Sequence, residues 1–251
     1  MLPLDAHAHI EPDIHPDSLT ELNACVIAMT RSLQEFESVR ERHDSRTVWA
    51  VGSHPALPSA HRSFSVERFA ELLQKAAVVG ELGLDRRCRV DMSEQLATLH
   101  SALGAIRETP RIVSLHSVGA TSDVLDALDE HRVTAPLLHW WRGDRKATER
   151  AIEAGCYFSV NAAEAVNPKV IEYLPPERVL TETDHPFGDK KEIGQHRPGH
   201  VPTIEEALGR AWNADLEAVR RRVWENLGAL ITKTKSADLW PRSFQATLLT
   251  L

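Results

Sequence analysis

The chain has 251 residues, of which 42% are hydrophobic and 26% are charged, a composition typical of a soluble globular protein with an ample core. Its formal net charge of −7 argues against a protein that coats nucleic acid nonspecifically, because such binding depends on broad positive patches. No uninterrupted apolar stretch approaches the roughly 20 residues needed to span a bilayer, and no hydrophobic segment follows a basic N-terminus. We therefore expect no membrane association and a cytoplasmic location.

Eight short runs of aliphatic and β-branched residues are predicted as strands. They are Leu2–Asp5, Ala24–Met29, Val48–Val51, Val78–Leu82, Ile112–Leu115, Pro136–His139, Tyr157–Val160 and Val179–Thr183. Segments with helical spacing of apolar residues lie between them: Ser18–Leu22, Ser32–Arg42, Val66–Lys75, Met92–Ile106, Ser122–Glu130, Lys146–Ala154 and Glu164–Glu172. Regular alternation of this kind predicts parallel βα units, and eight units favour a closed (β/α)8 TIM barrel.

The chain continues beyond the eighth strand in three parts. A long loop, Pro186–Pro202, is expected beside the barrel mouth and precedes helices near Thr203–Asn213 and Leu216–Ile231. We therefore predict a single barrel domain over residues 1–231 and an extension over 232–251. The extension carries Trp240 and Phe244, which must be buried, so it either packs on the barrel's own helices or docks a protein partner.

Six residues that can bind metal stand at or just past the ends of the predicted strands. They are His7, His9, Glu81, His116, His139 and Asp184. Because strand ends converge at the mouth of a barrel, these side chains are expected to meet there. Taken singly, a strand-end histidine is more often a hydrogen-bonded core residue than a ligand, and a strand-end aspartate often caps the next helix. Four imidazoles and two carboxylates together favour a metal site.

Two of these segments carry most of that argument. In His7-Ala8-His9 the imidazoles point the same way on an extended strand, and Asp5 shares their parity. Glu81 places a carboxylate in an apolar strand end, which costs several kcal/mol unless a cation or strong donors compensate it. One ion rarely uses six ligands, whereas two ions bridged by a carboxylate would use them all, as two-metal hydrolysis at phosphorus requires. The donor set suits Zn, Mn, Fe or Ni and leaves Mg open.

Positive charge follows three of the metal-ligand candidates on the predicted loops. The basic residues are Arg86, Arg87 and Arg89 after Asp85, Arg142, Arg145 and Lys146 after His139, and Lys190, Lys191 and Arg197 after Asp184. A basic rim on an acidic body suits an anionic substrate. The alternative is that each of these side chains is simply solvated.

The motifs together resemble a known family. They are Asp5-Ala6-His7-Ala8-His9, Gly52-Ser53-His54-Pro55, Gly80-Glu81-Leu82-Gly83-Leu84-Asp85, His116, His139, Gly155-Cys156-Tyr157-Phe158-Ser159 and Glu182-Thr183-Asp184. Their order and spacing are similar to those of the TatD family of metal-dependent deoxyribonucleases, which belong to the amidohydrolase-like TIM barrels. The likeness runs from the first residues to about Leu230.

The resemblance implies a role for each matching residue. His7, His9 and Asp184 would hold one divalent ion, His116 and His139 a second, and Glu81 would bridge them. Asp184 would also accept the proton of the attacking water. His54 would contact a phosphate or lie behind the ligands. The alternative is that His54 serves only in a turn that Pro55 fixes. Asp5 and Glu182 would support the ligands from behind. The family implies DNA as substrate, often cut as a 3′ to 5′ exonuclease with a metal such as Mg.

The chain departs from the family pattern in segments next to the ligand candidates, and it keeps every ligand candidate. Arg86-Arg87-Cys88-Arg89 replaces an aromatic position, and Trp140-Trp141-Arg142-Gly143 replaces the commoner Cys-Phe-Ser-Gly. Arg86 and Arg142 are candidates for gripping phosphates, and Trp140 or Trp141 for stacking a base, unless the tryptophans serve packing alone.

Two other functional classes stay open at this stage. The same barrel and metals host small-molecule amidohydrolases and phosphoesterases. A subunit of a larger defence or nucleotide-processing complex, docked through the C-terminal extension, is the second.

Overall fold

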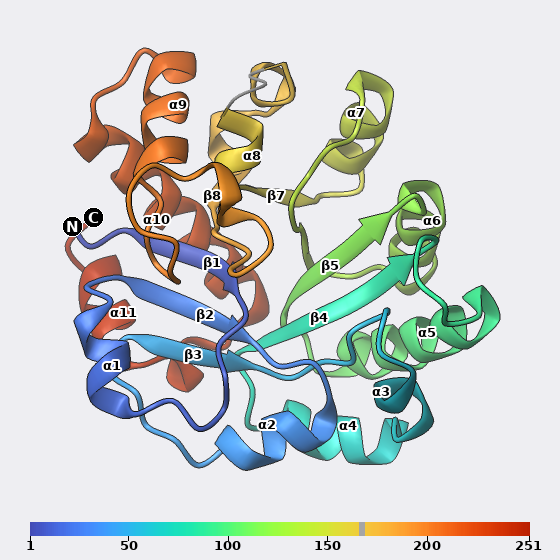
Figure 1. Ribbon diagram of the computed structural model, residues 1–251. Helices are drawn as coiled ribbons and strands as arrows, with labels where there is room; N and C mark the ends of the chain where they lie inside the picture. The colour runs from blue at the N-terminus through green and yellow to red at the C-terminus, as the bar shows by residue number, and fades with distance from the viewer. Residues whose placement is uncertain (166–168) are drawn as a thin grey trace.

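Eight parallel strands follow one another around the molecule in chain order (Figure 1). The computed structural model describes residues 1–165 and 169–251. Backbone pairing joins β1, β2 and β3 in one sheet and β4 to β8 in a second. The strands are β1 (Leu4–Ala8), β2 (Cys25–Met29), β3 (Thr47–Ala50), β4 (Val78–Asp85), β5 (Ile112–Val118), β6 (Ala135–Leu138), β7 (Tyr157–Val160) and β8 (Val179–Thr181).

Hydrogen bonds between backbones join the two sheets at both seams. Between β3 and β4, the Val51 N–H donates to the Val78 carbonyl at 3.1 Å and the Gly80 N–H donates to the Val51 carbonyl at 2.9 Å. Between β8 and β1, the Asp184 N–H donates to the His7 carbonyl at 2.8 Å. The strands therefore form a ring, and the predicted (β/α)8 TIM barrel is confirmed.

Helices cover the outside of this ring, where their apolar faces pack on the strands. They are α1 (Pro16–Glu21), α2 (Leu33–Val39), α3 (Pro58–Arg62), α4 (Val66–Leu73), α5 (Met92–Glu108), α6 (Thr121–His131), α7 (Arg145–Glu153), α8 (Ala162–Ala165), α9 (Pro202–Trp212), α10 (Leu216–Thr234) and α11 (Arg242–Leu248). Short 3-10 helices lie at Ile171–Tyr173, Pro176–Arg178, Asp189–Lys191 and Ala237–Leu239. None of the helices in the described ranges is long and apolar enough to cross a bilayer.

Local sequence signals explain where several helices begin and end. The side chains of Ser32, Ser65 and Asp144 each accept a hydrogen bond from a backbone N–H in the first turn of the helix that follows. At the other end, Arg132 closes α6 and Asn213 closes α9 in the left-handed conformation. These contacts satisfy backbone groups that a helix terminus leaves without a partner.

The predicted boundaries differ from the structure mainly where buried polar residues continue a strand. The first strand, predicted to end at Asp5, extends to Ala8, and β4 continues past Leu82 to Asp85. The extension of β1 carries the buried ligand candidate His7, so a search for apolar runs ended that strand too early, whereas the extension of β4 consists of Gly83, Leu84 and Asp85. The short helix α3 was not predicted. The helix predicted at Glu164–Glu172 includes residues 166–168, which lie outside the described residues.

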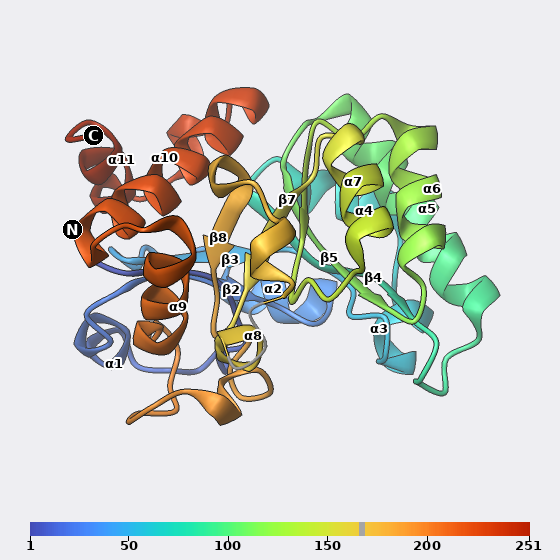
Figure 2. The same ribbon diagram turned by 90° about the horizontal axis from the view of Figure 1, so that it is seen from above.

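The C-terminal extension lies against α10, on the side of the barrel where the two chain ends come close together (Figures 1 and 2). Phe244 of α11 is fully buried, and its ring lies 5.5 Å from that of Trp224 in α10 and 5.2 Å from that of Trp240. The Ser243 hydroxyl donates to the Ser45 carbonyl. The extension thus buries its two aromatic residues within its own chain.

Candidate metal centre

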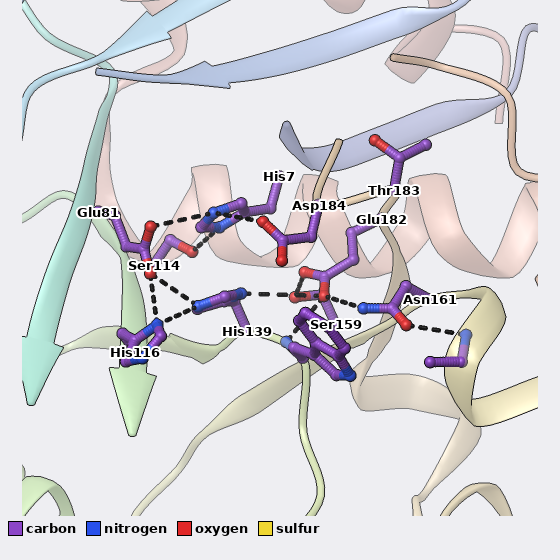
Figure 3. A network of polar contacts seen from close by, with 12 residues as sticks. His7, Glu81, Ser114, His116, His139, Ser159, Asn161, Glu182, Thr183 and Asp184 are labelled. Atoms are coloured by element: carbon purple, nitrogen blue, oxygen red, sulfur yellow. Dashed lines mark hydrogen bonds and ion pairs between the residues drawn. The ribbon is translucent and has the colours of Figure 1, made fainter. Parts of the chain in front are cut away.

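Six side chains from five strands converge at the carboxyl-terminal mouth of the barrel, and all of them except His9 are labelled in Figure 3. They are His7 of β1 with His9 just beyond it, Glu81 of β4, His116 of β5, His139 directly after β6, and Asp184 three residues after β8. The structure therefore brings together all six ligand candidates that the sequence singled out.

Gly52 makes room for this convergence. A Cβ atom at Gly52 would lie 2.4 Å from the carbonyl carbon of Gly80, a distance that real Cβ atoms do not adopt. Without a side chain, the backbone after β3 passes close enough for the Ser53 N–H to donate to the Glu81 carbonyl at 3.0 Å. Glycine at 52 therefore fixes His54 and Glu81 next to each other.

One half of the centre is formed by His7, His9, Glu81 and Asp184. Glu81 Oε2 lies 3.6 Å from His7 Nε2 and 3.2 Å from His9 Nε2. Asp184 Oδ1 lies 3.7 Å and 3.6 Å from the same two nitrogens. Two imidazoles and two carboxylates thus enclose one small space.

The other half is formed around the second oxygen of the same glutamate. Glu81 Oε1 lies 2.6 Å from His116 Nδ1 and 2.9 Å from His139 Nε2, and these two nitrogens lie 3.1 Å apart. Glu81 therefore presents one carboxylate oxygen to each half of the centre, the arrangement that a bridging ligand requires.

The residues present fit divalent metal ions. His7 Nε2, His9 Nδ1, Glu81 Oε2 and His139 Nδ1 are buried without a hydrogen-bond partner within the described parts of the chain. Leaving buried polar atoms without partners costs roughly 1–3 kcal/mol each, which a bound cation offsets for those that ligate it. Imidazole nitrogen and carboxylate oxygen are the donors that Zn and Mn accept, and the carboxylates leave Mg open.

The close packing of imidazoles and carboxylates shifts the pKa values of Glu81 and Asp184 in opposite directions. Burial alone would raise the pKa of Glu81, but the imidazoles of His54, His139 and His116 outweigh it and hold that pKa well below its usual range. Burial also raises the pKa of Asp184, and the nearby Glu182 and Glu81 carboxylates add to the rise. Asp184 therefore favours its protonated form, whereas Glu81 favours its charged form.

His54 lies against the first half of the centre. Its Nδ1 accepts a hydrogen bond from the Ala56 N–H at 3.1 Å, which leaves the proton of the neutral ring on Nε2. Nε2 lies 3.3 Å from Glu81 Oε2. The ring of His54 thus directs its Nε2–H toward the centre without forming a hydrogen bond to Glu81.

A layer of polar residues supports the ligands from behind. Ser114 Oγ lies 2.8 Å from His7 Nδ1, which orients the ring and leaves Nε2 to face the carboxylates. Asp5 accepts hydrogen bonds from the backbone N–H groups of His7, Thr183 and Gly199. Asp5 therefore ties β1 to the segment before Asp184 and to the long loop. Burial raises the pKa of Asp5 to about 6, although these donors oppose the rise.

Glu182 forms the corresponding support on the far side of His139 (Figure 3). Its Oε1 accepts from the Trp140 N–H at 2.8 Å and from the Asn161 side chain at 3.2 Å, and its Oε2 accepts from the Ser159 hydroxyl. Oε1 also lies 3.9 Å from His139 Nδ1. Glu182 therefore joins the ends of β6, β7 and β8 beneath the ligands.

A cavity of about 480 Å³ opens beside the second half of the centre. His116, His139, Trp140, Arg142 and Arg87 are among the residues that line it. The buried carboxylate of Glu164 accepts from Trp140 Nε1 at 3.2 Å and lies 3.4 Å from Arg142 Nε, so it holds both side chains at the rim.

The two tryptophans differ in position. Trp141 is 1% exposed, packs on Phe158 and donates to the Thr148 hydroxyl, which makes it a core residue. Trp140 is partly exposed at the cavity. The packing alternative therefore describes Trp141, and Trp140 is left as the candidate for stacking.

The arginines after β4 also differ from one another. Arg86 is half exposed and pairs with Asp123 in the first turn of α6 at 2.8 Å. Arg87, its neighbour, lines the cavity instead. The sequence could not distinguish the two positions, because both residues follow the same strand.

Sequence reasoning missed Ser114, Ser159 and Asn161. Each is a small polar residue within or just after a predicted strand, and each is fully buried. A buried hydroxyl or amide in a strand signals that a partner must be near, but the sequence does not say which one.

Comparison with known proteins finds metal-dependent hydrolases and deoxyribonucleases among the relatives of this chain. The model of the TatD related DNase family matches residues 4–232. The uncharacterized metal-dependent hydrolase YabD of Bacillus subtilis is 22% identical, with 88% of this chain and 96% of the relative covered. The deoxyribonuclease Tat-D of Schizosaccharomyces pombe is 24% identical, with 63% of this chain and 62% of the relative covered.

Solved structures show the same fold. YJJV, a TatD homologue from Escherichia coli K12, superposes with a TM-score of 0.76 at 20% identity, covering 90% of this chain and 97% of the other. A phosphotriesterase homology protein from Escherichia coli, solved with phosphate in its active site, gives a TM-score of 0.61 at 16% identity, covering 88% and 96%. At these identities the likeness concerns the barrel alone.

Proposed function

This chain belongs to the TatD related DNase family of metal-dependent hydrolases, and from that premise we propose that it hydrolyses phosphodiester bonds in DNA with two divalent ions. The observation that carries the proposal is the position of Glu81, whose two oxygens face two separate groups of ligands. Donor sets that share one carboxylate are what two-metal hydrolysis at phosphorus uses.

Each half of the centre has its own ligands in this proposal. His7, His9 and Asp184 would hold one ion, His116 and His139 the other, and Glu81 both. When bound, the ions supply positive charge that stabilises the charge developing on the phosphate oxygens.

The chain's own residues position the substrate and move the proton. Asp184 directs Oδ1 toward His7 and His9, and we assign to Oδ2 the acceptance of a proton from the attacking water. His54 directs Nε2 toward the centre, 3.3 Å from Glu81 Oε2, and we assign to it a contact with a phosphate oxygen.

The cavity beside the centre supports a substrate with a free end. Its volume of about 480 Å³ is in the range of sites for small molecules, so it suits a terminal nucleotide better than a length of duplex. Arg142 and Arg87 would pair with phosphates, and Trp140 would stack on a base. We therefore propose that the protein acts as an exonuclease on single-stranded DNA and that it cuts in the 3′ to 5′ direction.

One experiment addresses metal, substrate and direction together. Chelator-stripped protein is incubated with 5′-labelled single-stranded DNA, duplex DNA and RNA, and Mg, Mn or Zn is added back separately. We expect single-stranded DNA to shorten stepwise from its 3′ end and only after metal addition. The absence of cleavage with every ion, in protein whose circular dichroism shows it folded, would refute the proposal.

The competing function is hydrolysis of a small phosphate ester or amide. The fold is shared with the phosphotriesterase homology protein, and the cavity would accept such a substrate. Turnover of bis-p-nitrophenyl phosphate without any cleavage of oligonucleotides would favour this alternative.

A further inference from the structure

A second histidine cluster lies on the outside of the barrel, where α5 packs beside α6 (Figures 1 and 2). We propose that His100 of α5 and Glu130 and His131 of α6 form a binding site for a transition-metal ion such as Zn²⁺. The site is separate from the centre at the barrel mouth, and it does not rest on the proposed function.

The distances between the donor atoms support this assignment. His100 Nδ1 lies 2.9 Å from His131 Nε2 and 3.8 Å from Glu130 Oε2, and one ligand atom from each residue falls within 4.8 Å of the others. A zinc ion about 2.0–2.1 Å from each nitrogen keeps two ligand nitrogens roughly 3 Å apart. The two nitrogens share a hydrogen bond in this structure, and an ion would take the place of its proton with a small opening of the pair and a small movement of the carboxylate.

The way the two helices pack brings the rings together. His100 lies one turn before Gly104 in α5, and the His131 ring rests 4.0 Å from the position that a Cβ at Gly104 would occupy. A side chain at 104 would extend toward this ring. The His131 ring thus lies over Gly104, where a Cβ would make only an ordinary van der Waals contact with it.

Charge around the cluster is balanced for a cation. His131 is the last residue of α6, where the free carbonyl groups of the helix end favour positive charge. Arg107 is close enough to His131 to contribute to lowering its pKa, after burial and His100, and Glu130 opposes that effect. The Glu130 carboxylate thus places negative charge next to the two imidazoles.

The donor set also selects among metals. Two imidazoles with one carboxylate suit Zn²⁺, Co²⁺, Ni²⁺ or Cu²⁺, whereas Mg²⁺ prefers oxygen ligands and retains its water. The side chains of His100 and Glu130 are 36% and 67% exposed, so an ion reaches them directly from solvent. An ion bound here would join α5 to α6, the helices that follow the strands carrying Glu81 and His116.

The test counts bound metal in the full-length, chelator-stripped protein. Wild type and the variants His131→Gln and His100→Gln are equilibrated with ZnCl2, freed of excess metal by gel filtration, and analysed for zinc per chain. His43→Gln, a change at an exposed histidine on another face, is the matched control. A parallel series uses MgCl2.

We expect each of the two cluster variants to bind one zinc equivalent fewer than wild type, with the control unchanged and the magnesium content equal in all proteins. Zinc should also raise the melting temperature of wild type more than that of either variant. Equal zinc content in wild type and both cluster variants overturns the proposal. Should one cluster variant fail to fold, the other and Glu130→Gln, at an exposed position, give the same comparison.

Discussion

The two histidine clusters of this protein differ in what surrounds them. At the barrel mouth the ligands project from strands, are largely buried, and are held by a further layer that includes Ser114, Asp5 and Glu182. On the outer helices, His100 and His131 are partly exposed and contact chiefly each other and Glu130. The difference teaches that a site built for catalysis is recognised by its supporting layer as much as by its ligands, because that layer fixes geometry before an ion binds.

Removing the shared ligand should have the largest effect. Glu81→Gln keeps the size of the side chain but removes the charge that both halves of the centre share. We expect metal-dependent hydrolysis to fall by more than ~100-fold, beyond the roughly 10–100-fold cost of changing residues behind a metal ligand. Initial rates across metal concentrations measure the loss, and circular dichroism shows whether the fold is kept. Wild-type turnover in this variant would remove Glu81 from the mechanism.

A change in the supporting layer tests the comparison itself. Glu182→Gln removes the negative charge near His139, while the Ser159 hydroxyl can turn to accept from the new amide group. We expect activity to fall by about 10–100-fold with the ligands intact. Ser159→Ala is the matched control, since it removes one donor and leaves the charge, and its loss should be smaller. Similar losses in both variants would mean that packing, rather than charge, is what Glu182 provides.

Much of the centre was predictable from the sequence, for a physical reason. Strand ends in a barrel meet at one mouth, so polar residues after apolar runs are placed by chain order alone, as His116 and His139 illustrate. The family resemblance then supplied the pairing of ligands into two halves. The boundary of β1 was predicted too early, because buried His7 continues a strand that its apolar residues appear to end.

The other features of the site could not be predicted, because they depend on contacts between segments that are far apart in the sequence. Nothing in the neighbourhood of Ser114 indicates that its hydroxyl faces His7, 107 positions away. The same is true of Arg86, which pairs with Asp123 of α6, and of Arg87, which lines the cavity. The outer cluster was not predicted at all, since helical histidines meet through the packing of α5 on α6 and not through any spacing in the sequence.

A smaller effect on metal-dependent activity is expected when His7 loses the hydrogen-bond partner that orients its ring. Ser114→Ala leaves His7 Nδ1 without its 2.8 Å partner in the barrel interior. We expect metal affinity to fall by about tenfold, at the lower end of what such supporting residues contribute. Because His7 itself remains, the rate at saturating metal should recover most of the wild-type value. A loss of rate that no metal concentration reverses would show that Ser114 acts on the reaction rather than on binding.

The smallest effect is expected at the rim, where solvent screens charge. Arg142→Ala removes an exposed guanidinium held by Glu164, and an exposed ion pair is worth about 0.2–1 kcal/mol, or roughly 1.5- to 5-fold in affinity. We expect KM for a single-stranded oligonucleotide to rise by that amount, with little change for bis-p-nitrophenyl phosphate, which is too small to span the rim. Arg86→Ala is the matched comparison, because its side chain is bound to Asp123 away from the cavity, and its effect should be the weaker. If Arg86→Ala instead weakened oligonucleotide binding more than Arg142→Ala, the substrate would have to leave the centre across α6 rather than past Trp140.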